Sequence, residues 1–314
     1  MSSFFSEAPA NAVLMVPPRH FGFNRETSKD NVFQHRPTTS SERVRQSAVS
    51  EFNAMVHNLE QAKISVVIMD AHDEKHTPDA VFPNNWLTTH PSGEVLLYPM
   101  HTPNRQAEVK PKALKRVLNE AGYAVNQLMD VATLEAHCSG SLEGTGAMVF
   151  DHTNQRIFTA LSERCDNVLL ERLCHYGGVN DYITFDTQGS TGTPIYHTNV
   201  LMSIGPTLAI VCKEAIVKDQ RARVMKALNA THDVMEISMA QMETQFCGNI
   251  LAVKNRQNET YWVMSSSAYH GMSASQQAQL KEHGLPVVSS IETIERVGGG
   301  SCRCMVAEIF LPIL

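Results

Sequence analysis

Apolar and polar positions along the chain recur in one order: a helix-like stretch, a short strand-like run, a polar loop and two further strand-like runs. The first runs of this kind begin at residues 64, 123, 181, 232 and 285, so they recur roughly every 50 to 60 residues, as in a repeat architecture. Helical periodicity precedes them, for example over 44–62 and 112–121. Gly122 and Gly284 lie where such helices would end. The predicted strands are 64–69, 123–128, 181–186, 232–237 and 285–290.

Each polar loop is followed by two alternating or β-branched runs joined by a short turn, which predicts a hairpin. One hairpin is split between the chain ends, because its strands are 12–16 and 305–311. Pairing of these two segments would close a ring and remove sheet edges. The pattern predicts an α/β fold of five units around an axis, and an ordinary layered α/β domain is the alternative. The other predicted hairpins are 86–90 with 95–100, 147–152 with 156–161, 200–205 with 208–212 and 250–255 with 260–265.

Composition is that of an ordinary globular protein, with 314 residues, 43% hydrophobic and 18% charged. A net charge of −6 without a basic stripe argues against nucleic-acid binding. No apolar run approaches the ~18 residues of a membrane span, and the first residues do not resemble a signal peptide. Seven cysteines without C-x-x-C spacing predict reduced thiols. We therefore expect a cytoplasmic protein with one catalytic domain over residues 1–314, no membrane or nucleic-acid partner, and a homodimer left open.

The polar loops ahead of the hairpins occupy equivalent places in the five units, so a ring would bring them to one mouth. They carry Asp79, Glu143, His197 and a cysteine. Each of these alone is more typical of a turn or a solvated loop. Their recurrence at equivalent points favours a catalytic site with an acid, a base and a nucleophile.

The run Gly298-Gly299-Gly300-Ser301-Cys302-Arg303-Cys304-Met305 is the most informative of these loops. Glycines allow backbone to approach a ligand closely and to adopt positive φ. A neighbouring arginine would favour the thiolate of a cysteine nucleophile. A glycine-rich turn with two buried thiols is the alternative, since free cysteine is commonly buried.

Four motifs together resemble the guanidine-modifying superfamily, which includes arginine deiminase, dimethylarginine hydrolase and the amidinotransferases. The resemblance is nearest to the arginine-deiminase-related branch of citrulline utilisation hydrolases, and it extends from Met15 to Phe310. It implies a five-bladed, pseudo-symmetric α/β propeller (the pentein fold) closed by pairing of the N- and C-terminal segments. The motifs are 78–86 (PDAVFPNNW), Glu143-Gly144, His197-Thr198-Asn199 and 298–305; segments 21–24 and 103–105 also resemble that branch.

The resemblance implies a role for each matching residue. Cys304 matches the nucleophile, His197 the general acid/base, and Glu143 the carboxylate beside the substrate and the histidine. Asp79 matches a carboxylate that grips the planar nitrogen group of the substrate. Arg105 falls where an arginine holds the α-carboxylate, although Gln106 stands where a second arginine is common. The implied substrate-binding residues are Asp79, Asn85, Phe82, Arg105 and Asn24, and no metal or cofactor is required.

Two asparagines depart from the pattern of guanidinium hydrolases, which usually carry aspartate at both places. A guanidinium has five donors and no acceptor, so it calls for paired carboxylates. A ureido group has a carbonyl oxygen, to which the amide of Asn85 can donate. Asn85 therefore favours citrulline over arginine. Asn199, near His197, predicts a lower pKa for the histidine than a carboxylate partner would give.

We therefore expect a cysteine-dependent hydrolase that cleaves a C–N bond of a ureido or guanidino amino acid and releases ammonia, most simply from citrulline. The thiolate attacks the planar carbon, and the histidine protonates the departing ammonia and then deprotonates water. Alternatives are an arginine deiminase or dimethylarginine hydrolase, an amidinotransferase with an amine acceptor, and a non-catalytic ligand-binding propeller. Cys302 is a second candidate nucleophile, because residues i and i+2 of a strand share a face.

Overall fold

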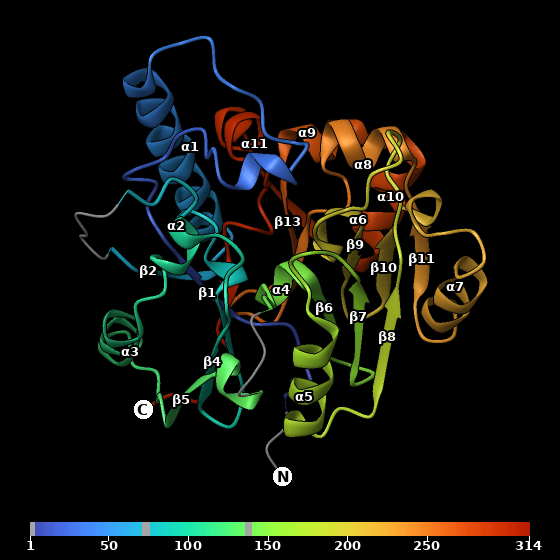
Figure 1. Cartoon of the computed structure of the whole chain (residues 1–314), viewed down its shortest axis with the longest axis horizontal. Helices are drawn as coiled ribbons and strands as arrows, with labels where there is room; N and C mark the ends of the chain where they lie inside the picture. Colours follow the sequence, from blue (N-terminus) through green and yellow to red (C-terminus); the bar gives the residue numbers. More distant parts are fainter. Residues whose placement is uncertain (1–3, 71–75, 136–139) are drawn as a thin grey trace.

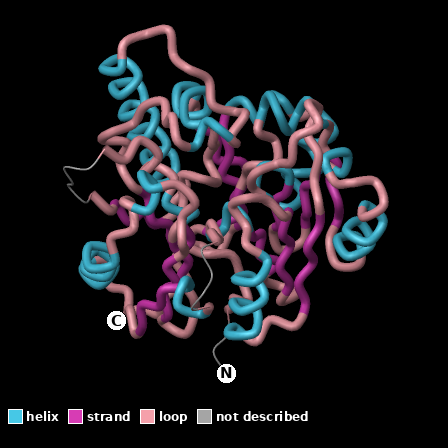
Figure 2. Tube along the Cα trace, in the orientation of Figure 1, coloured by secondary structure: helices cyan, strands magenta, loops and turns pink. Residues whose placement is uncertain are grey.

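Five separate three-stranded sheets are arranged around an axis in the computed structural model, which describes residues 4–70, 76–135 and 140–314 (Figure 1). In every sheet one strand pairs antiparallel with the central strand, and a third strand pairs parallel with it on the other side. A helix connects each pair of parallel strands, because the short loops that join antiparallel strands cannot make this crossover. Figure 2 shows these helices toward the outside of the molecule. This five-sheet α/β architecture confirms the predicted fold class.

Four sheets follow one another along the chain, and the bounds of their strands and crossover helices are as follows. The first has β3 (Leu87–Thr89), β4 (Glu94–Leu97), α3 (Pro111–Glu120) and β5 (Gln127–Asp130). The second has β6 (Met148–Asp151), β7 (Arg156–Ala160), α5 (Asn167–Gly177) and β8 (Asp181–Phe185). The third has β9 (Met202–Ile204), β10 (Leu208–Val211), α7 (Arg221–Asn229) and β11 (Asp233–Glu236). The fourth has β12 (Leu251–Lys254), β13 (Thr260–Ser265), α10 (Ala274–His283) and β14 (Leu285–Ser289).

The remaining sheet joins the two ends of the chain, as the sequence predicted. It contains β15 (Ala307–Glu308), β1 (Ala12–Met15) and β2 (Ser65–Ile68), with α1 (Ser41–Gln61) as its crossover. β15 and β1 run antiparallel with Val13 opposite Glu308. This pairing completes one sheet, but it does not remove sheet edges, because the five sheets stay separate and each keeps its own edge strands.

The crossover helices pack through apolar stripes with helical spacing. α1 starts after Ser40, whose side chain accepts a hydrogen bond from the backbone N–H of Arg43. The glycines predicted to end helices do so: Gly122 follows α3 with φ of 90°, and Gly284 caps α10. No helix in the described ranges is long and apolar enough to cross a bilayer. The buried stripe of α1 consists of Val44, Ala48, Phe52, Met55 and Leu59.

Three predicted strands begin at least two residues later than the hydrophobic pattern indicated. The strand predicted at 305–311 is reduced to β15, which starts at Ala307, because residues 302–305 form a turn. The strand predicted at 123–128 is β5 and starts at Gln127, because Asn126 N–H first bonds to the carbonyl of Gly93 at 2.8 Å. The strand predicted at 200–205 starts at Met202, because Val200 and Leu201 belong to the one-turn helix α6 (Thr198–Leu201). Apolar side chains in a buried single turn resemble a strand in sequence, so periodicity could not separate the two.

Candidate active site

Three of the predicted site residues each lie directly before a one-turn helix. Phe82 precedes η2 (Pro83–Asn85), Glu143 precedes α4 (Gly144–Ala147), and His197 precedes α6. Each turn leads into the first strand of a sheet, and α4 contacts both η2 and α6. Equivalent positions of three consecutive sheets therefore meet at one end of the axis, as the repeat predicted.

Cys304 lies in a turn between α11 (Glu292–Gly298) and β15, not on a strand. Its backbone N–H donates to the carbonyl of Ser301 at 3.0 Å. Because the backbone turns here, the rule that residues i and i+2 share a face does not apply. Cys304 lines a cavity with His197, whereas Cys302 is fully buried and is not among the lining residues.

This cavity brings together most of the residues that the sequence singled out. Six of them line it, and the other two lie directly behind: Glu143 contacts His197, and Asn24 donates to Asp79. Gly146 permits the close packing, since a Cβ there would collide with Asn85 Nδ2 and lie 2.7 Å from His197 Cε1. The lining residues are Asn31, Asp79, Phe82, Asn85, Arg105, Arg164, Tyr196, His197, Gly298, Gly299, Gly300 and Cys304.

His197 and Glu143 form a buried pair, with Nε2 and Oε2 separated by 2.8 Å. Burial lowers the pKa of His197, and the opposing effect of Glu143 does not outweigh it. Burial alone would raise the pKa of Glu143, but Arg164 and the bond from His197 hold it well below its usual range. The pair therefore consists of a neutral imidazole beside an ionised carboxylate, which suits a base that accepts a proton during the reaction.

Arg164 is a buried cation of this site that the sequence did not reveal. Its guanidinium donates to both carboxylate oxygens of Asp30 at 2.6 and 2.7 Å and lies 3.4 Å from Glu143 Oε2. Its Cζ lies 4.7 Å from the ring centroid of Tyr196, a cation–π contact. The segment Ser162-Glu163-Arg164 looks like a solvated polar loop in sequence, so only tertiary structure identifies this arginine.

Two asparagine amides face the sulfur of Cys304. Asn249 Nδ2 lies 3.3 Å and Asn199 Nδ2 lies 3.7 Å from Sγ, both with donor geometry. The sequence had placed Asn199 near His197, but its amide bonds to the cysteine. The repeated asparagine immediately before an apolar run, at 85, 199 and 249, is the sequence signal that could identify Asn249.

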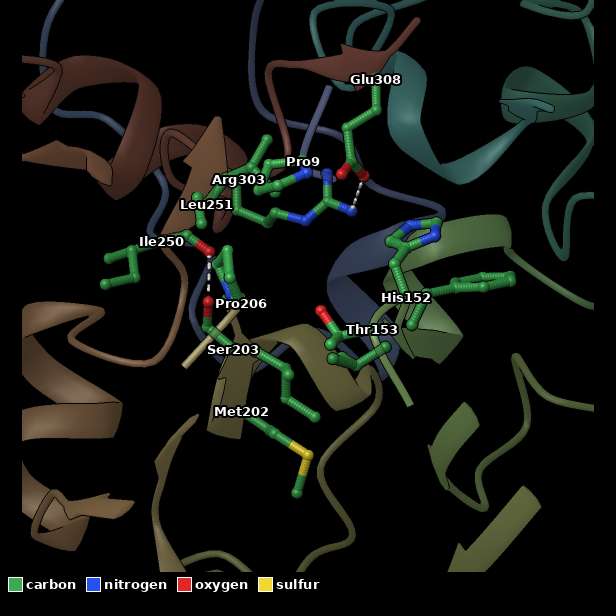
Figure 3. A pocket seen from close by; sticks show the side chains of 15 residues that line it. Pro9, His152, Thr153, Met202, Ser203, Pro206, Ile250, Leu251, Arg303 and Glu308 are labelled. Atoms are coloured by element: carbon green, nitrogen blue, oxygen red, sulfur yellow. Dashed lines mark hydrogen bonds and ion pairs between the residues drawn. The ribbon is translucent and has the colours of Figure 1, made fainter. Parts of the chain in front are cut away.

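Arg303 favours the thiolate of Cys304 through its charge, as the sequence indicated, but its guanidinium forms hydrogen bonds elsewhere. Its side chain lies in a second cavity, which Cys304 does not line, and bonds to Glu308 at 2.8 Å and to the carbonyl of Val306 (Figure 3). Burial raises the pKa of the Cys304 thiol, and the hydrogen bonds from Asn249 and the charge of Arg303 only partly oppose this. The free protein therefore holds a neutral thiol.

Asp79 and Asn85 each present a polar atom that finds no partner among the described residues. Asp79 Oδ2 accepts from Asn24 at 2.7 Å and from Thr27 at 2.9 Å, while its Oδ1 has no hydrogen-bond partner in residues 4–70, 76–135 and 140–314. Asn85 Oδ1 accepts from Arg105 at 2.6 Å, while its Nδ2 has no partner in the same described ranges. Both orphan atoms are buried, and buried polar groups normally find partners, so they mark hydrogen bonds that a ligand can complete.

Arg105 lines the cavity, yet its guanidinium is already engaged by the protein. It forms a buried ion pair with Glu108, with Nη2 to Oε2 at 2.9 Å, and donates to Asn85 and to the carbonyl of Phe82. The structure thus gives it partners other than a substrate α-carboxylate, and that role stays a prediction.

A family model described as N,N dimethylarginine dimethylhydrolase, eukaryotic, matches residues 17–311. The chain belongs to this family. Its members hydrolyse carbon–nitrogen bonds of guanidino compounds, so the chain is a hydrolase of the guanidine-modifying superfamily. A search of curated proteins by sequence returns no match.

Solved structures of this superfamily share the fold. ArgZ, an arginine dihydrolase from cyanobacteria, has a TM-score of 0.71 at 16% identity, over 96% of this chain and 41% of ArgZ. The N-terminal domain of ArgZ bound to substrate gives 0.69 at 16%, over 96% and 99%. An adduct of dimethylarginine dimethylaminohydrolase with S-methyl-L-thiocitrulline gives 0.65 at 13%, over 96% and 100%. At these identities the likeness shows the fold alone, and the chain spans under half of full-length ArgZ.

The reactivity of Cys304, the predicted nucleophile, can be tested by alkylation. Because burial raises the pKa of the Cys304 thiol above that of an ordinary cysteine, its thiolate fraction at neutral pH is small and grows about tenfold per pH unit. The rate of inactivation by iodoacetamide should therefore rise continuously from pH 7 to 9. The label should be located by peptide mass spectrometry. A rate that is already constant between pH 7 and 9 would show a preformed thiolate and contradict this account.

Proposed function

We propose that this protein hydrolyses citrulline, with Cys304 as nucleophile, His197 as acid/base and Glu143 as the carboxylate that supports the histidine. The observation that carries the proposal is the pair of orphan atoms, Asp79 Oδ1 and Asn85 Nδ2. One is an acceptor and the other a donor. A ureido group offers N–H groups and a carbonyl oxygen, so it satisfies both, whereas a guanidinium offers donors only.

The reaction follows from the contacts around the thiol. His197 takes the proton of Cys304, and the amides of Asn199 and Asn249 stabilise the sulfur as it becomes anionic. Sγ attacks the ureido carbon, and the amino group leaves as ammonia with the proton from His197. An S-carbamoyl intermediate remains.

Water then completes the cycle. His197 deprotonates a water molecule, which attacks the carbonyl carbon and breaks the C–S bond. The proton returns to the sulfur, and the released carbamate loses carbon dioxide to give ornithine. Glu143 stabilises the imidazolium at both stages, since its pKa lies well below its usual range and it stays ionised.

We expect citrulline to have a higher kcat/KM than arginine, by roughly 5- to 150-fold. A guanidinium places a donor against Asn85 Nδ2 and leaves that nitrogen without a hydrogen bond, which costs about 1–3 kcal/mol of binding free energy. Asn85→Asp should narrow or invert this preference. Release of ammonia from citrulline, arginine and agmatine, and of dimethylamine from dimethylarginine, measures it.

Cys304→Ser serves as the blank in that assay. A wild-type preference for arginine would overturn the citrulline proposal. An unchanged ratio in Asn85→Asp would show that Asn85 does not distinguish the substrates.

Hydrolysis of arginine is the second candidate, because the buried acceptor Asp79 Oδ1 fits an N–H of a guanidinium as well as one of a ureido group. A likeness to ArgZ, an arginine dihydrolase, adds to its plausibility. The number of ammonia molecules released per ornithine separates the two: one from citrulline, two from arginine.

We further propose that residues 1–314 act as one catalytic unit, because residues from Asn24 to Cys304 contribute to the site. Its ligand would be a small amino acid. A cytoplasmic location and a homodimer stay predictions from the sequence.

A further inference from the structure

A buried arginine behind the cavity fixes the orientation of the Asn85 amide. Arg105 Nη1 lies 2.6 Å from Asn85 Oδ1, and both side chains are about 2% exposed. Arginine carries donors only, so the amide oxygen must face it, and the amide nitrogen must point the other way. The orientation of the Asn85 amide is therefore fixed by the donor character of arginine. It does not depend on distinguishing the amide oxygen from the amide nitrogen by shape.

The amide nitrogen fixed in this way lies beside Gly146, which also adjoins the ring of His197, and Asn85 and His197 line the same cavity. Among the described residues, Asn85 Nδ2 has no hydrogen-bond partner. A ligand atom that meets Nδ2 must therefore be an acceptor. If the amide turned over, the oxygen would face the cavity instead, and a donor such as a guanidinium N–H would fit.

The other contacts of Arg105 prevent it from moving away. Nε lies 3.1 and 3.2 Å from the Glu108 oxygens, Nη2 bonds to Glu108 at 2.9 Å, and Nη2 also donates to the carbonyl of Phe82 at 2.8 Å. Glu108 is itself buried, so it neutralises the guanidinium locally. The ion pair holds the nitrogen that faces Asn85 in one place, as a bidentate fork does.

We infer that Arg105 is a specificity-determining positioning residue: by holding Asn85 Oδ1, it makes Asn85 present a donor and so selects a substrate carbonyl over a guanidinium. This inference rests on the proposed function. It differs from the sequence-based role for Arg105, in which its guanidinium holds the α-carboxylate shared by citrulline and arginine. It also differs from a purely structural role in anchoring α2 (Pro103–Gln106).

The test compares three forms of the full chain. Arg105→Gln with Glu108→Gln replaces the ion pair by two amides, which can hydrogen-bond to each other. The glutamine at position 105 can donate or accept, so it no longer fixes the Asn85 amide. Arg105→Lys is the matched control, because an ammonium is also a donor without an acceptor and keeps a partner in Glu108.

We expect the ratio of kcat/KM for citrulline over arginine to fall at least about fivefold in the double variant and to stay within about twofold of wild type in Arg105→Lys. Thermal melting shows whether each form is folded. If the double variant does not fold, Arg105→Met with Glu108→Leu takes its place, since apolar residues of similar volume often replace a buried ion pair without loss of stability.

Three outcomes separate the possibilities. An unchanged ratio in a folded double variant overturns the inference, and a common rise in KM for both substrates would then assign Arg105 to the α-carboxylate. The inference is also overturned if the ratio of kcat/KM for citrulline over arginine falls as far in Arg105→Lys as in the double variant. A wild type that does not hydrolyse citrulline sinks the proposed function itself, independently of the two variants.

Discussion

Replacing Cys304 with serine should abolish turnover, whereas replacing Cys302 with serine should leave most of it. Only Cys304 lines the cavity with His197, and only its sulfur is approached by the amides of Asn199 and Asn249. Loss of a nucleophile in a cysteine or serine hydrolase costs about 10⁴-fold or more in kcat. A serine hydroxyl is far harder to deprotonate, so residual attack should be negligible.

Steady-state ammonia release measures both variants, and circular dichroism melting confirms that they fold. Cys302 is fully buried, so its serine variant should melt somewhat lower because a hydroxyl replaces an apolar thiol. The opposite pattern, with activity lost in Cys302→Ser and kept in Cys304→Ser, would reverse the assignment.

Deleting residues 305–314 should unfold the protein, not merely inactivate it. β15 would no longer pair with β1, and Ile309 N–H would lose its bond to the carbonyl of Ala12 at 2.9 Å. Four large apolar side chains are buried in this segment, and each stabilises the fold by about 1.5–3 kcal/mol. Their sum is comparable with the whole stability of a typical domain, about 5–15 kcal/mol. They are Met305, Val306, Ile309 and Leu311.

Removal of Leu314 alone is the matched control, since its side chain is 75% exposed and outside the core. Far-ultraviolet circular dichroism during thermal and urea denaturation measures both truncations. A form lacking 305–314 that still melts cooperatively would count against the importance of this terminal pairing.

The architecture could be predicted because each repeat carries its own periodicity and turn residues. Gly122 and Gly284 end helices as predicted, and the strands that the fifth unit lacks are supplied by the segments at the two termini. The late start of β5 could not be predicted, since it depends on a bond between Asn126 and Gly93 in another segment.

The candidate site could be predicted where a residue stands in a motif, and not where it depends on long-range packing. Cys304, His197 and Asp79 meet around one cavity as expected. Arg164 was missed because nothing local distinguishes a buried arginine from a solvated one. Arg303 favours the thiolate through its charge as expected, but its ion pair with Glu308 depends on tertiary packing that the sequence does not show.

The sheet that joins the two ends of this chain affects how the chain folds while it is being synthesised. β1 leaves the ribosome before the strands of the four other sheets, but its partner β15 is made only after them. At about 5–20 residues per second, that strand waits roughly 15 to 60 s with one hydrogen-bonding edge open. Open strand edges recruit other chains. A nascent chain that stalls or ends early therefore exposes the unpaired edge of β1, which can bind other chains. The yield of folded protein should then depend on the supply of chaperones more strongly than the stability of the folded state would suggest.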